Sequence, residues 1–111
     1  MPRFAAYDLA LQAAATLRPL LDPIGRRDPD LCRQVRRAAS SVAMCLDEGS
    51  QRAGGDRLHL YRVAAGSAAE VRTALTLAAT WGYVTSQEAD GARVLLDRVV
   101  AILWRLTHPI C

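Results

Sequence analysis

Apolar residues recur at spacings of three and four in four stretches of the chain, the pattern of amphipathic helices. We predict helices over about residues 4–21, 29–51, 56–81 and 86–107, and no strand. The chain has 111 residues, which is enough for one hydrophobic core and too few for two. We therefore expect one all-α domain over residues 1–111.

Turn and cap residues indicate where the first two helices end and begin. Pro19 predicts a kink near the end of the first helix, and the Pro and Gly within Asp22–Gly25 predict a break after it. Asp28 is suited to cap the second helix, with Pro29 at its first position, where a missing N–H costs nothing.

The third and fourth helices have signals of their own. Gly82 predicts the end of the third helix, and Thr85 and Glu88 have capping-box spacing at the start of the fourth. Gly66 lies inside the third helix, where glycine costs about 1 kcal/mol relative to alanine. Such a cost predicts a second backbone passing close to Gly66, because small side chains let helix axes approach.

Between residues 94 and 106 the fourth helix is apolar over most of its circumference. A helix of this kind must bury a second face, and in a short chain another subunit supplies that burial most easily. The predicted interface residues are Val94, Val99, Ile102, Leu103 and Leu106.

All 14 basic residues are arginine, and against 11 acids they give a net charge of +3. The excess lies between Arg26 and Arg62, and the flanking segments are balanced, which predicts one basic surface. Codon usage in a GC-rich genome accounts for an arginine-only set, and so does selection for bidentate phosphate contacts. The candidate nucleic-acid contacts are Arg26, Arg27, Arg33, Arg36, Arg52 and Arg57.

The pattern of reactive side chains predicts no enzyme. Three cysteines without CxxC spacing indicate neither a disulfide framework nor a zinc site, and favour a reducing, cytoplasmic compartment. His59 and His108 lack the Glu-x-x-His pattern of metal-binding bundles, so we expect no metal and no cofactor. Glu70 is more readily explained by an inter-helix salt bridge to an arginine such as Arg37 than by catalysis. No segment is long and apolar enough to predict a membrane span.

Three short segments resemble a known family. Residues 37–42 read RAASSV, residues 47–50 read DEGS, and residues 61–67 end in AAGS with a glutamate three positions later. These segments resemble the 23S rRNA intervening sequence proteins, whose patterns are R-A-A-x-S-[IV], A-E-G and A-x-G-S-x-x-E. The matching residues are Arg37, Glu48, Gly49, Gly66, Ser67 and Glu70. The family's usual Asn before A-E-G is absent, and Ala65 stands where a basic residue is common.

The resemblance implies an up-and-down, antiparallel four-helix bundle that assembles into a homopentameric ring. It also implies a kinship with the accessory variability proteins of diversity-generating retroelements, which bind a reverse transcriptase and nucleic acid. Two functions are therefore expected. The first is a non-enzymatic oligomeric scaffold that binds RNA or DNA through its arginines, and the second is an adaptor for a protein such as a reverse transcriptase.

Overall fold

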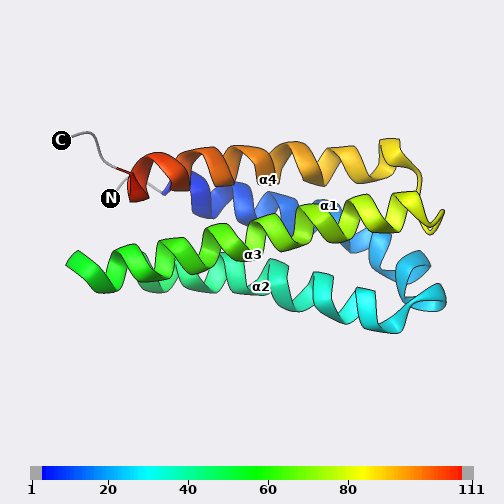
Figure 1. Cartoon of the computed structure of the whole chain (residues 1–111), viewed down its shortest axis with the longest axis horizontal. Coiled ribbons are helices and arrows are strands. Elements are labelled where there is room, and N and C mark those ends of the chain that lie inside the picture. Colours follow the sequence, from blue (N-terminus) through cyan, green and yellow to red (C-terminus); the bar gives the residue numbers. More distant parts are fainter. Residues whose placement is uncertain (1–3, 109–111) are drawn as a thin grey trace.

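The computed structural model describes residues 4–108, which form four helices (Figure 1). They are α1 (Ala5–Arg27), α2 (Pro29–Ser50), α3 (Gly54–Thr80) and α4 (Ser86–Thr107). Successive helices run in alternating directions along a body of 44 × 23 × 21 Å. The predicted all-α helical bundle is confirmed within these residues.

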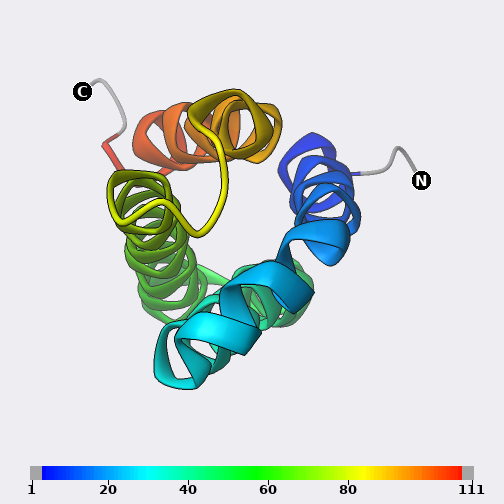
Figure 2. The same ribbon diagram turned by 90° about the vertical axis from the view of Figure 1, so that its right-hand side faces the viewer.

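The four helices surround one core, as the view along the bundle shows (Figure 2). α1 packs against α2 and α4, and α3 packs against the same two helices from the opposite corner. The core consists of Ala, Leu, Val and Ile at three- and four-residue spacing, with Tyr61 as its one buried aromatic side chain in the described part of the chain. Burying one large aliphatic side chain contributes about 1.5–3 kcal/mol, so this stripe determines which face of each helix turns inward.

The first helix is longer than the sequence predicted. α1 continues through Pro19 and Pro23 to Arg27, and only Asp28 separates it from α2. The predicted break at Asp22–Gly25 is therefore wrong. Each proline removes one helical hydrogen bond, but Leu20 and Ile24 extend the buried stripe by two more turns. Here the burial of apolar surface outweighs the local preference for a turn.

The predicted caps are confirmed. The Leu31 N–H donates to Asp28 Oδ1 at 3.0 Å, and Pro29 occupies the first turn of α2. At α4 the Glu88 N–H donates to Thr85 Oγ1 at 3.0 Å, and the Thr85 N–H donates to Glu88 Oε1 at 2.8 Å. The backbone N–H of Thr85, and after it the Thr85 hydroxyl, hydrogen-bond to the Glu88 carboxylate and lower the pKa of Glu88 below its ordinary value.

The two family-motif glycines have different surroundings. A Cβ on Gly49 would lie 2.7 Å from Tyr61 Cε1, so α2 and α3 approach each other too closely there for any side chain. A Cβ on Gly66 would meet no atom within 4 Å. The prediction that a second backbone passes Gly66 is therefore wrong within residues 4–108.

The two turns at one end of the bundle are joined by hydrogen bonds. Arg27 Nη1 donates to the carbonyl oxygen of Gly82 at 3.0 Å, and the Tyr83 hydroxyl donates to Asp28 Oδ2 at 3.3 Å. Gly82 has a φ of 80°, a left-handed conformation that glycine adopts without strain, and it ends α3 as predicted. Partial burial raises the pKa of Tyr83, and the carboxylate of Asp28 raises it further.

We predict that Gly49→Ala lowers the free energy of unfolding by about 1–3 kcal/mol, because the new methyl group must displace the Tyr61 ring. That ring is buried and packs against Phe4 with ring centroids 5.5 Å apart, so it has little room to move. Urea unfolding measures the change. Gly55→Ala is the matched control, since a Cβ there meets open space and stability should not fall. Equal midpoints for Gly49→Ala and wild type would contradict the close approach.

We also predict that Asp28→Asn lowers the pKa of Tyr83, because the substitution removes the neighbouring negative charge while asparagine still caps α2. Because the pKa of Tyr83 is raised in the folded state, its hydroxyl hydrogen bond stabilises the fold fully at pH values below the ordinary tyrosine pKa. This stabilisation is lost as the pH rises through the folded value. An NMR titration of the Tyr83 ring measures both proteins. Asp30→Asn, in the same turn but without contact to Tyr83, should leave the titration unchanged.

Candidate nucleic-acid interface

Three open hollows lie along the outside of α1 and α2, and Arg36 lines all of them. The first is formed by α2 alone, and the other two lie between α1 and α2. Five arginines line these hollows, and we refer to them together as the arginine surface: Arg18, Arg26, Arg33, Arg36 and Arg37. Two carboxylates, Asp22 and Asp30, lie among them, so the surface has a net positive charge.

Two features of the fold bring these arginines together. Arg18, Asp22 and Arg26 follow at intervals of four on α1, which places them in one row along the helix. Because only Asp28 links α1 to α2, the start of α2 returns directly beside this row. The Cys32 thiol donates to the Leu21 carbonyl oxygen at 3.4 Å, which fixes the two helices side by side.

Four of the five arginines of this surface have no ion-pair partner in the described structure. Arg33 pairs with Asp30. Among residues 4–108, the guanidinium groups of the other four make no hydrogen bond and no ion pair: Arg18, Arg26, Arg36 and Arg37. All five side chains are exposed. Like charges gathered at an exposed surface repel one another, and a bound polyanion would relieve this repulsion.

The remaining predicted contacts lie elsewhere. Arg27 is held at the turns by the Gly82 carbonyl oxygen. Arg57 donates to the carbonyl oxygens of Gly49 and Ser50, at 3.1 and 3.2 Å, and so caps the far end of α2. Arg52 lies 3.7 Å from Glu48 and 3.9 Å from Asp56. The six candidates therefore do not form one surface, because α2 is about 33 Å long and separates them.

The expected salt bridge between Arg37 and Glu70 is absent among the described residues. Arg37 points away from the core and lines a hollow instead. Of the two arginines that sequence reasoning left out of the basic surface, Arg37 had been assigned to this bridge. Arg18 was left out because it precedes the stretch from Arg26 to Arg62, in which the sequence concentrates its net charge. The four-residue spacing of Arg18, Asp22 and Arg26 was the signal available in the sequence.

The predicted interface on α4 divides into two parts. Val99 and Leu103 are fully buried in the core of the single chain, so their assignment to a contact between copies is corrected. They continue the inward stripe of Ala92 and Leu96 at three- and four-residue spacing. Val94 and Leu106 are exposed, and Ile102 is half-buried.

The C-terminal turn of α4 adds an exposed aromatic pair. Trp104 is exposed and stacks on His108 with ring centroids 4.4 Å apart. Within residues 4–108, no three side chains of His, Cys, Asp or Glu lie close enough together to hold a metal ion. None of the described helices combines the length and apolar character needed to cross a membrane.

Comparison with known proteins agrees with this architecture. A crystal structure of a protein with unknown function from the S23 ribosomal protein family of Bacteroides thetaiotaomicron VPI-5482 superimposes with a TM-score of 0.82. At 17% sequence identity it covers 92% of this chain and 97% of its own, and it establishes the fold alone. No curated protein matches the chain. The family model described as 23S rRNA-intervening sequence protein matches residues 5–105, and the chain therefore belongs to the 23S rRNA-intervening sequence protein family.

Proposed function

We propose that this chain is a non-enzymatic, homo-oligomeric scaffold that binds nucleic acid, RNA in the first place, through the arginine surface of α1 and α2. The observation that supports this most strongly is the cluster of four exposed arginines that form no ion pair in the described structure. The family's description, which refers to a ribosomal RNA, supports RNA over DNA.

The chemistry of the surface favours phosphate recognition. Guanidinium groups bind phosphate oxygens through paired hydrogen bonds, and Arg18, Arg26 and Arg36 have all their donors available. Phosphate contacts position a nucleic acid but carry little sequence information. We therefore expect binding that tolerates changes of sequence and weakens as the salt concentration rises.

Assembly would strengthen a weak surface. A protomer with a net charge of +3 has a modest field, and several copies around a ring would present the same surface repeatedly to one strand. The family resemblance supports a ring of five copies, each of them an antiparallel four-helix bundle. The exposed apolar residues of α4, among them Val94 and Leu106, support a contact between neighbouring copies.

An adaptor function is the alternative, in which the oligomer presents a surface to a protein such as a reverse transcriptase. The exposed Trp104 on α4 favours it, because tryptophan is enriched at the centres of protein interfaces. Both functions suit a cytoplasmic protein. A pull-down from the native host that recovers a protein partner and no RNA would favour the adaptor.

The decisive experiment compares arginine variants in an RNA titration monitored by fluorescence anisotropy at several salt concentrations. Arg36→Gln should weaken binding for all RNA sequences and reduce the slope of log affinity against log salt by about 1. Arg18→Gln and Arg26→Gln should act in the same direction.

Arg105→Gln is the matched control, because it removes an exposed arginine of α4 that also lacks an ion pair in the described structure. It lowers the net charge equally but lies outside the arginine surface. Equal losses for Arg36→Gln and Arg105→Gln would show that total charge, and not this surface, determines binding. An affinity that does not decline with salt would exclude phosphate contacts altogether.

A further inference from the structure

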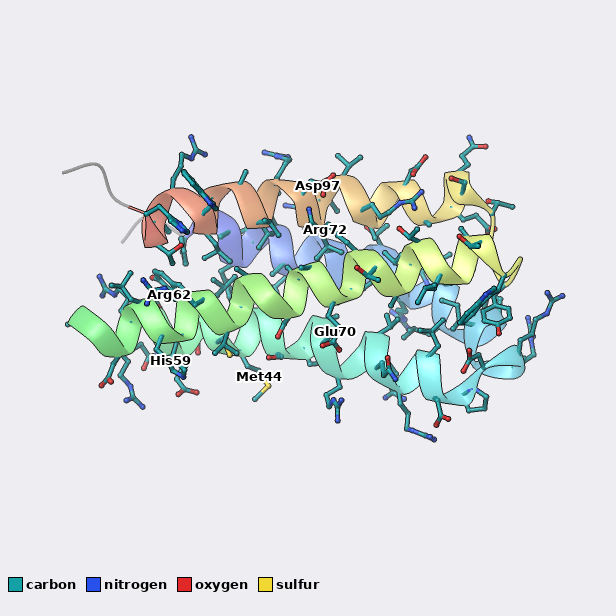
Figure 3. All side chains as sticks on the ribbon, viewed as in Figure 1. Met44, His59, Arg62, Glu70, Arg72 and Asp97 are labelled. Atoms are coloured by element: carbon teal, nitrogen blue, oxygen red, sulfur yellow. The ribbon has the colours of Figure 1, made fainter. Side chains whose placement is uncertain are left out.

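The outward side of α3 has a glycine between two opposite charges. Arg62, Gly66 and Glu70 follow at intervals of four, so they form one row along α3. Figure 3 shows Arg62 and Glu70 on this helix. Nothing in the chain approaches Gly66, since a Cβ there would meet no atom within 4 Å. Glycine in a helix interior lowers stability by about 1 kcal/mol relative to alanine. No contact within the described chain requires a glycine at this position.

Apolar surface lies next to this glycine. Met44 of α2 is 66% exposed, and Val63, one helical turn before Gly66 on α3, is 38% exposed. The Ser67 hydroxyl donates to the Ser41 hydroxyl at 3.0 Å, so α2 and α3 are joined at this point and present one continuous face. Met44 points outward from α2 in Figure 3, so its side chain is available to a partner on this face.

The charges on this face are unpaired and self-complementary. Within residues 4–108, neither Arg62 nor Glu70 takes part in an ion pair. They lie about 12 Å apart along the axis of α3, with Gly66 midway between them. This surface has a positive charge on one side of Gly66 and a negative charge on the other. It is therefore complementary to an identical surface that is rotated by 180° about an axis through Gly66.

We propose that the face of α2 and α3 around Gly66 binds a second copy of this chain across a two-fold axis. The two α3 helices then cross at Gly66, and Arg62 of each copy lies opposite the partner's Glu70. The charges select this arrangement, because the parallel alternative brings Arg62 against Arg62. Packing of rows spaced by four residues predicts a crossing angle of about 50°. Gly66 permits the close approach, and the exposed Met44 and Val63 become buried.

This two-fold contact differs from the proposed function in both surface and symmetry. The arginine surface lies on α1 and α2, and a ring is built from contacts that are not two-fold. The inference shares only self-association with the proposed scaffold, and nucleic-acid binding does not enter into it. In a ring, the same face would join two rings back to back.

Light scattering on a sizing column, over a range of protein concentrations, tests the contact. The wild-type mass should be an even multiple of the 12.1 kDa protomer, and Gly66→Leu should halve it, because the new side chain separates the two α3 helices. Thermal unfolding at low concentration should show no loss of stability in Gly66→Leu, since leucine is the better helix former and has open space. Ala15→Leu, at an exposed position on α1, is the matched control and should keep the wild-type mass.

Charge reversal provides the second test. Arg62→Glu and Glu70→Arg should each weaken association, and the double variant should restore it, since the ion pairs are rebuilt with exchanged partners. A wild-type monomer, or a Gly66→Leu protein with the wild-type mass, overturns the two-fold contact. RNA titration of Gly66→Leu separates the two proposals, because its arginine surface is intact: loss of mass with retained RNA binding supports both.

Discussion

The single residue between α1 and α2 determines much of this structure. Asp28 ends one helix and caps the next, and its second carboxylate oxygen accepts a hydrogen bond from Tyr83 in the turn between α3 and α4. With no loop to absorb a change of direction, α2 must return directly along α1. That return places the positive charges of two helices on one surface. The hydrogen bond from Tyr83 to Asp28 joins the α1–α2 link to the α3–α4 turn at the same end of the bundle.

Local chemistry made the helices, their caps and the family motif predictable. The stripe at spacings of three and four, the box of Thr85 and Glu88, and the stop at Gly82 depend on residues near one another in sequence. The predictions that were wrong concerned contacts between residues that are distant in sequence. The break predicted at Asp22–Gly25 was wrong because the burial of Leu20 and Ile24 against other helices cannot be inferred from the segment itself.

The candidate site was predictable in part for the same reason. Arg26, Arg33 and Arg36 lie together as the charge distribution indicated, but Arg57 caps a helix end and Arg52 is surrounded by acids. Composition gives the number of charges and not their partners. On α4, nine large apolar residues in thirteen exceeded one stripe, and only the packed structure separates Val99 and Leu103, which the chain buries itself, from Val94 and Leu106.

The two prolines of α1 have a consequence for motion. Each removes an amide donor, so the last third of this helix forms two fewer backbone hydrogen bonds than its length would allow. Segments with fewer such bonds open at lower free energy than the rest of a fold. Arg18 and Arg26 lie in or beside this segment, while Arg33, Arg36 and Arg37 lie on the intact first half of α2. We therefore expect the α1 side of the arginine surface to open at lower free energy than the α2 side, so that Arg18 and Arg26 can change their spacing while Arg33, Arg36 and Arg37 keep theirs.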